Sequence, residues 1–328
     1  MDRRRFTSLA LGSAAAVLAR PPAASAETGT IKFVVGTAPG GAIDPYARIV
    51  ADPMSKALKG NIIVEYKPGA NGNASARYIV EQPADGALVW IGTQAFTEIN
   101  PSAFSNQHWS IDDFVEIIRG VEAPLVFAAH PSVPANTFDE FLTWARANKG
   151  KLSYASYQPG TPSHFLGYQL NEKFDLDLTH VPYRGSGLQA TALVGGQSLF
   201  GFAQVNSTMP MAEAGKLKIL AITNPTRYRF LPKVPTFAEL GHPEFTAKVW
   251  FGLFVKKGTP DDIIKRYTNA AKVAHNDADV KKKLEAQGFE VVGETGPDLI
   301  PNIKVQIERW AKLVKASGFS AEDRGATK

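Results

Sequence analysis

Residues 31–58 read IKFVVGTAPGGAIDPYARIVADPMSKAL and contain one complete strand, loop and helix unit. The apolar run at residues 31–36 predicts a buried strand, and the glycines and proline that follow predict a turn. Asp44 and Pro45 fit an N-cap and a first-turn proline, so we expect a helix from there to about Leu58. A strand whose loop leads directly into a helix is the building unit of an open α/β sheet.

Strand and helix signals of this kind alternate along the rest of the chain. Turn residues follow each apolar run and precede a segment that suits a helix, which is the order of α/β proteins with parallel strands. The further strands are expected near residues 62–65, 87–92, 152–155, 178–181, 199–202 and 217–222. The sequence therefore predicts an α/β fold with two open, mainly parallel sheets.

Two longer apolar runs stand where the pattern passes from one half of the chain to the other. They are Ala123–Ala129, which prolines follow, and Lys248–Val255. If both runs cross between the sheets, the chain leaves a first domain, builds a second and returns. This predicts a discontinuous first domain, residues 27–125 and 252–328, and a second domain, residues 126–251. Two connections between domains are typical of a hinged binding cleft.

The amino terminus has the build of a secretory signal peptide. A basic head, Arg3–Arg5, precedes an apolar stretch at residues 6–18 and the small residues Ala24-Ser25-Ala26. The apolar stretch is too short to span a bilayer, which needs about 20 residues. We expect residues 1–26 to be removed and the mature protein to be periplasmic. Export by the twin-arginine route and by the general secretory route both remain open.

Composition and charge exclude several classes of function. The 328 residues include 44% hydrophobic and 20% charged residues, as in an ordinary folded protein. Without the signal peptide, 32 basic residues face 30 acidic ones, and they are scattered along the sequence. A nucleic-acid partner is therefore not expected, because phosphate binding needs a clustered basic surface. The absence of cysteine excludes thiolate metal sites, thiol nucleophiles and disulfides.

The sequence lacks the local motifs of catalytic and nucleotide-binding sites. It contains no G-x-S-x-G nucleophile elbow and no Gly-rich phosphate loop after the first strand. Its six histidines show no H-x-x-x-H or H-E-x-x-H spacing, so we expect no metal site. We expect no catalytic residues and no cofactor, although a Ser/His/Asp triad built from distant residues stays open.

Five loops rich in glycine and hydroxyl residues each come directly after a strand and before a helix. In open α/β sheets the ligand lies at the carboxyl ends of the strands, where these loops are. Glycine lets the backbone approach a ligand, and free amides at a helix start favour an anion. Any single loop is explained as well by turn formation. The loops are residues 37–42, 68–72, 92–94, 156–164 and 182–187.

The motifs in these loops resemble the tripartite tricarboxylate transporter substrate-binding proteins, the TctC or Bug family. They are Pro39-Gly40-Gly41 with Asp44 and Arg48, Lys67-Pro68-Gly69-Ala70, Pro83-Ala84-Asp85-Gly86, Gly160-Thr161-Pro162-Ser163-His164 and Val181-Pro182-Tyr183-Arg184-Gly185. The resemblance covers essentially the whole mature chain. It implies a two-lobed "Venus flytrap" fold, a monomer, a small carboxylate ligand between the lobes, and delivery to membrane permease subunits.

The resemblance also implies which residues hold the ligand. The loop after the first strand is expected to grip one carboxylate, and residues of the second domain to face it. The first group is Ala38, Gly40, Gly41, Ala42 and Asp44, and the second includes Thr161, Ser163 and His164. Further residues at strand ends complete the expected site: Thr93, Ser156, Tyr183, Ala203, Gln204 and Asn206.

Two of these residues have alternative roles. Asp44 precedes Pro45, so we favour helix capping for it, with indirect help to the site. His164 lies near the start of a predicted helix and could be a half-covered helix residue instead of a ligand contact.

One departure from the family pattern bears on the ligand. Ala203 occupies a position where the resemblance implies that an aspartate is common. An aspartate there can pair with the ammonium group of an amino acid and repel a second ligand carboxylate. Its replacement by alanine predicts a dicarboxylate without an α-amine, aliphatic or aromatic. A ligand sensor that acts on a histidine kinase remains the alternative to delivery to a permease.

Overall fold

The computed structural model describes residues 29–321, so the predicted signal peptide lies outside the described residues. The strands are β1 (Ile31–Val35), β2 (Ile62–Tyr66), β3 (Leu88–Thr93), β4 (Phe114–Ala129), β5 (Ser153–Ser156), β6 (Thr179–Pro182), β7 (Phe200–Gln204), β8 (Lys218–Ile222), β9 (Lys248–Lys256) and β10 (Glu290–Glu294). The α-helices are α1 (Ile43–Leu58), α2 (Asn73–Glu81), α3 (Asn100–Ala103), α4 (Phe138–Ala147), α5 (Pro162–Phe174), α6 (Ser186–Val194), α7 (Val205–Glu213), α8 (Asp261–Asn276), α9 (Ala278–Ala286) and α10 (Leu299–Ser317). Four shorter turns of helix are η1 (Ala70–Gly72), η2 (Ala95–Ile99), η3 (Ile111–Asp113) and η4 (Pro243–Phe245).

The long strand β4 belongs to two sheets. Its first part, as far as Pro124, pairs with β9, and its last five residues, Leu125–Ala129, pair with β7. The first sheet has the order β2-β1-β3-β9-β4, with β10 on β4, and the second runs β4-β7-β5-β6, with β8 on β4. The two sheets are therefore continuous through β4, and the pairing changes sheet between Pro124 and Leu125.

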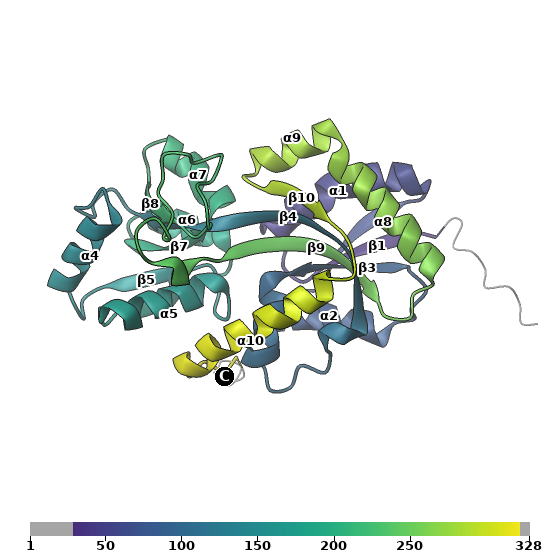
Figure 1. Cartoon of the computed structure of the whole chain (residues 1–328), viewed down its shortest axis with the longest axis horizontal. Coiled ribbons are helices and arrows are strands. Elements are labelled where there is room, and N and C mark those ends of the chain that lie inside the picture. Colours follow the sequence, from purple (N-terminus) through teal and green to yellow (C-terminus); the bar gives the residue numbers. More distant parts are fainter. Residues whose placement is uncertain (1–28, 322–328) are drawn as a thin grey trace, which may run out of the picture.

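The two-lobed α/β fold is confirmed. In Figure 1, β4 and β9 run side by side through the middle of the molecule, with α1 and α8 at one end and α4, α5, α6 and α7 at the other. The sheets are mixed, because β4 and β9 run antiparallel to the strands beside them, while β1, β2 and β3 are parallel, as are β5, β6 and β7. The domain limits at residues 125 and 252 stay a prediction, although Lys248 already pairs with Pro124 in the first sheet.

Each lobe has its own aromatic core. In the first, Trp90 packs against Phe96, Trp109, Phe114 and Phe254, with ring centroids 4.7–6.2 Å apart. In the second, Phe127 on β4 is surrounded by Phe138, Phe141, Phe200, Phe202 and Phe237. Such rings bury large apolar areas, so each lobe holds its loops on a rigid support.

The C-terminal helix α10 contacts both lobes. It packs against η2 and α3 of the first lobe and against α5 of the second. The hydroxyl of Tyr168 on α5 donates to the carbonyl oxygen of Ala316 at 2.7 Å. The ring of Phe319, just after α10, lies 5.7 Å from that of Phe165. A third connection between the lobes therefore exists besides β4 and β9.

Candidate functional site

A cavity of about 920 Å³ lies between loops of the two lobes. The first lobe contributes the loops after β1, β2 and β3, and the second contributes the loops after β5 and β6 and the end of β7. These are carboxyl ends of strands, the place where open α/β sheets bind ligands. Val249 and Phe251 add part of β9 to the wall. A crossing strand is therefore in direct contact with the cavity.

The fold brings together eight of the residues predicted from the sequence. Four come from the loop after β1, one from the end of β3, and three from the second lobe. They are Ala38, Gly40, Gly41, Ala42, Thr93, Thr161, Tyr183 and Gln204. Their contact with a ligand stays a prediction, but they share one cavity.

The loop after β1 directs a helix start at the cavity. Gly40 has a φ of 84°, a left-handed conformation that favours glycine. Nothing lies within 4 Å of the position that its Cβ would take, so the backbone angle and not crowding requires glycine here. The loop leads into α1, whose first N–H groups have no acceptor within the helix and carry its positive end. This is a favourable place for an anion.

The predicted N-cap role of Asp44 is wrong. Helix α1 begins at Ile43, two residues before the predicted start at Pro45, with Ala42 in the N-cap position and no side-chain cap. Asp44 therefore lies inside the first turn, where its carboxylate reaches back and accepts a hydrogen bond from the backbone N–H of Gly40 at 3.0 Å.

Asp44 supports the loop instead of lining the cavity. Besides the Gly40 amide, its carboxylate accepts hydrogen bonds from Arg48, at 2.8 Å, and from the hydroxyl of Tyr66. Burial alone would raise the pKa of Asp44, but the hydrogen bonds from Tyr66, Gly40 and Arg48 together lower it. The carboxylate stays ionised and fixes the loop that forms one end of the cavity.

In the second lobe the cavity wall is organised around Tyr157. Its buried hydroxyl makes hydrogen bonds with the side chains of Thr161 and Gln204 and with the backbone of Ser163. Burial raises the pKa of Tyr157 although these hydrogen bonds act in the opposite direction, so the phenol stays protonated. Tyr157 was not among the residues predicted from the sequence, although its loop was.

Four other predicted residues are placed away from the cavity lining. Ser163 is fully buried and its hydroxyl donates to the carbonyl oxygen of Phe202. Ser156 lies 2.7 Å from Nε2 of His180, measured from its Oγ. The other two are Ala203, fully buried on β7, and Asn206, near the start of α7. A direct ligand contact of these four stays a prediction, and the structure gives two of their side chains other partners.

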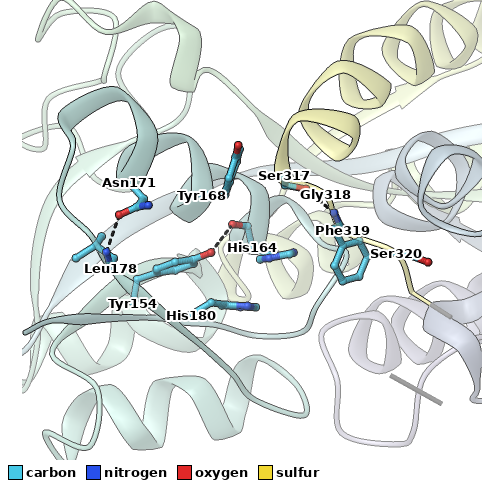
Figure 2. A pocket seen from close by; sticks show the side chains of 10 residues that line it. All are labelled: Tyr154, His164, Tyr168, Asn171, Leu178, His180, Ser317, Gly318, Phe319 and Ser320. Carbon is cyan, nitrogen blue, oxygen red and sulfur yellow. Dashed lines mark hydrogen bonds between the residues drawn. The ribbon is translucent and has the colours of Figure 1, made fainter. Parts of the chain in front are cut away.

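His164 faces a second, smaller cavity of about 390 Å³ (Figure 2). Its ring is stacked on that of His180, with centroids 4.1 Å apart, and Phe319 from the C-terminal segment meets it edge-on. Its Nδ1 accepts a hydrogen bond from the backbone N–H of Gly160 at 3.3 Å. The alternative expectation, a helix-start residue covered by neighbours, describes this geometry, and ligand contact through His164 stays a prediction.

The charge on the side chains that line the main cavity is positive only. Among the described residues that line it, Arg184 is the only one with a charged side chain, and none carries a carboxylate. Arg184 is exposed and forms no ion pair with the described part of the chain. A cavity with one cation and several helix starts is suited to an anionic ligand.

The first-lobe lining residues that were not predicted as site residues include Asn71, Gln94 and Phe96. Asn71 and Gln94 belong to loops that the sequence identified, but the directions of their side chains could not be read from it. Phe96 fills the space beside Gly72, where a Cβ would lie 2.5 Å from its ring and where φ is 87°. A larger residue at Gly72 would therefore displace this wall.

The described residues, 29–321, contain no group of three or more His, Cys, Asp or Glu side chains that could hold a metal ion. Within the same range, no helix is long and apolar enough to cross a membrane.

Comparisons with known proteins agree with this geometry. A family model described as the tripartite tricarboxylate transporter family receptor matches residues 46–319. The chain is 31% identical over 286 residues to a protein encoded in the tcbD–tcbE intergenic region of Pseudomonas sp. (strain P51). This alignment covers 87% of this chain and 85% of that protein. A structure of a Rhodopseudomonas palustris protein with adipate is 26% identical with a TM-score of 0.82, covering 89% and 98% of the two chains. MatC from the same organism, with bound malate, is 28% identical with a TM-score of 0.78, covering 87% and 98%.

Proposed function

Because this chain belongs to the tripartite tricarboxylate transporter receptor family, we propose that it is a periplasmic solute-binding protein that captures a small dicarboxylate between its lobes. The observation that carries the proposal is the lining of the main cavity, which has one arginine and no carboxylate among the described residues. The solved relatives with adipate and malate support a carboxylic acid as the class of ligand.

Two parts of the cavity suit the two ends of a diacid. The amides of Gly41, Ala42 and Ile43 at the start of α1 form an anion-binding end in the first lobe, while the Gly40 amide donates to Asp44. Arg184 and the start of α6, with Gly185 and Ser186, form a cationic end in the second lobe. A diacid that bridges them would hold the lobes together.

The ligand is proposed to lack an α-amine. An ammonium group needs a carboxylate partner to offset the loss of water, and none lines the cavity in the described part of the chain. This reasoning replaces the one from Ala203, because Ala203 is buried in β7 away from the lining.

Calorimetric titration with matched acids tests this proposal. Succinate should bind more tightly than aspartate, and glutarate more tightly than glutamate. Tighter binding of the amino acid in either pair would contradict the dicarboxylate assignment, and binding of none of the acids would contradict the function itself.

Capture is proposed to close the hinge, and the closed monomer to deliver the acid to membrane permease subunits without a catalytic step. The crossing strands β4 and β9 support hinge closure, since β9 itself lines the cavity. X-ray scattering should show a smaller radius of gyration with saturating acid. Uptake in membrane vesicles that contain the permease should require the loaded protein, and uptake without it would contradict delivery.

A further inference from the structure

The segment that follows α10 is attached to the first lobe on both sides of Phe319. Before it, the indole N–H of Trp310 on α10 donates to the buried carboxylate of Glu98 at 3.2 Å. After it, the backbone N–H of Ala321 donates to the carbonyl oxygen of Ala103 on α3 at 3.0 Å. Phe319 therefore moves with the first lobe, although its ring lies against the second.

Phe319 and the end of α10 contact helix α5 of the second lobe. The ring of Phe319 meets that of His164 edge-on, with centroids 5.0 Å apart (Figure 2), and that of Phe165 at 5.7 Å. Further along α5, the hydroxyl of Tyr168 donates to the carbonyl oxygen of Ala316 at 2.7 Å. Ring contacts and hydrogen bonds both need close approach, so separation of the lobes would break them.

Gly160 joins this contact to the main cavity. Its carbonyl oxygen accepts a hydrogen bond from Nδ2 of Asn71, on the first lobe, at 3.2 Å. Gly160 has a φ of 72°, and a Cβ on it would lie 3.3 Å from the Phe319 ring and 3.4 Å from the Asn71 amide. Tyr157 and Thr161 of the same loop line the cavity. A loop of the cavity wall is therefore held between two groups of the first lobe.

We propose that Phe319 and the last turn of α10 form a latch that holds the lobes closed around the ligand. This inference rests on the proposed function, capture between the lobes, and adds how the closed state is held. Strands β4 and β9 join the lobes in every state, whereas the contacts of Phe319 with α5 require that the lobes touch. Contacts made in one state only shift the equilibrium toward that state. The latch should therefore raise the affinity for a ligand that it does not touch.

Equilibrium binding of adipate to the full mature chain tests the latch in two variants that leave the cavity lining unchanged. Phe319→Ala removes the ring contacts, and Tyr168→Phe removes the hydrogen bond to Ala316. Neither Phe319 nor Tyr168 lines the main cavity. Each variant should raise the Kd for adipate about 2- to 12-fold, the range of one aromatic pair or one net hydrogen bond.

Phe174→Ala and Tyr267→Phe are the matched controls, because each removes the same kind of contact within a single lobe. The Phe174 ring is half-buried, as that of Phe319 is, and packs against Phe138 and Phe245 of the second lobe. The Tyr267 hydroxyl donates to the carbonyl oxygen of Gly86, within the first lobe, at 2.7 Å. Both controls should be less stable to urea than the wild type and should bind adipate with an unchanged Kd.

Wild-type affinity in both latch variants would overturn the inference while leaving the binding site intact, and so would an equal loss of affinity in the controls. If no acid binds the wild type, the proposed function is refuted, and X-ray scattering without ligand decides the latch. Phe319→Ala should then have a larger radius of gyration than the wild type. Equal radii would overturn the latch as well.

Discussion

Replacing Asp44 by asparagine should weaken ligand binding although Asp44 does not line the cavity. One carboxylate oxygen accepts from the Gly40 amide, and the other from Arg48 and Tyr66. Asparagine has the same size but only one acceptor oxygen. Its NH2 group, which cannot accept, must therefore point toward hydrogen-bond donors on one side. The single oxygen is expected to stay with the two donors Arg48 and Tyr66, so the Gly40 amide loses its acceptor and the loop Gly40–Ala42 is held less firmly.

The size of this effect follows from the exposure of the loop. A hydrogen bond contributes about 1 kcal/mol net to stability. The loss in Asp44→Asn should not exceed this value, because Gly40 is exposed and water can replace the lost acceptor. If the ordered loop is required for binding, about 1 kcal/mol corresponds to about a fivefold rise in Kd. Calorimetry with adipate measures it, and urea unfolding should show a parallel loss of about 1 kcal/mol.

Arg48→Gln and Tyr66→Phe are the controls for this prediction. Each removes a partner of Asp44 but leaves the carboxylate and its bond to the Gly40 amide. Both variants should bind adipate as the wild type does. Wild-type affinity in Asp44→Asn, or an equal loss in Arg48→Gln, would refute the reasoning that the carboxylate acts through Gly40.

Three further predictions concern stability and processing. Burial raises the pKa of Glu98 and of Glu116 to about 7, whereas the unfolded carboxyls ionise near their usual 4.5. The contribution of these two groups to the free energy of unfolding should therefore be largest below about pH 4.5 and fall as the pH rises to 7, by up to about 3 kcal/mol per group. Urea unfolding of the wild type, Glu98→Gln and Glu116→Gln at several pH values checks this, and variants with the same pH dependence as the wild type would contradict it. Ser163→Ala should lower the free energy of unfolding by about 1 kcal/mol and leave affinity unchanged, because the hydroxyl bonds to the Phe202 carbonyl; weaker binding at unchanged stability would assign the hydroxyl to the ligand. The exported protein should begin at residue 27, and an intact mass that includes residues 1–26 would exclude cleavage after Ala26.

Most strands could be predicted from the sequence, because a buried strand is made of apolar residues and appears as an apolar run. Strand β4 is an instructive exception, since it begins at Phe114 and not at Ala123. Glu116 and Arg119 interrupt the apolar pattern there. Both side chains are nevertheless largely buried and lie 3.5 Å apart as an ion pair. A charged residue can be accommodated in a strand when its partner is beside it, and the sequence does not show that pairing.

The loops of the site were predictable, whereas the directions of their side chains were not. Thr161, Ser163 and His164 are neighbours in sequence but point to three different environments. Thr161 is the N-cap of α5, and Ser163 and His164 lie in its first turn, where each residue advances about 100° around the helix axis. Which of them faces the cavity depends on how α5 is rotated against the sheet, and that rotation is set by packing.

The position of β9 between β3 and β4 sets an order in which the chain can be completed. Every strand of the second sheet lies before residue 223, so that sheet can form while the rest of the chain is still being synthesised or threaded across a membrane. The first sheet must wait for residues 248–256, and until they arrive β3 and the first part of β4 each present an unpaired edge. A chain truncated before β9 should therefore aggregate through β3 and the first part of β4, although the strands of the second sheet have already folded.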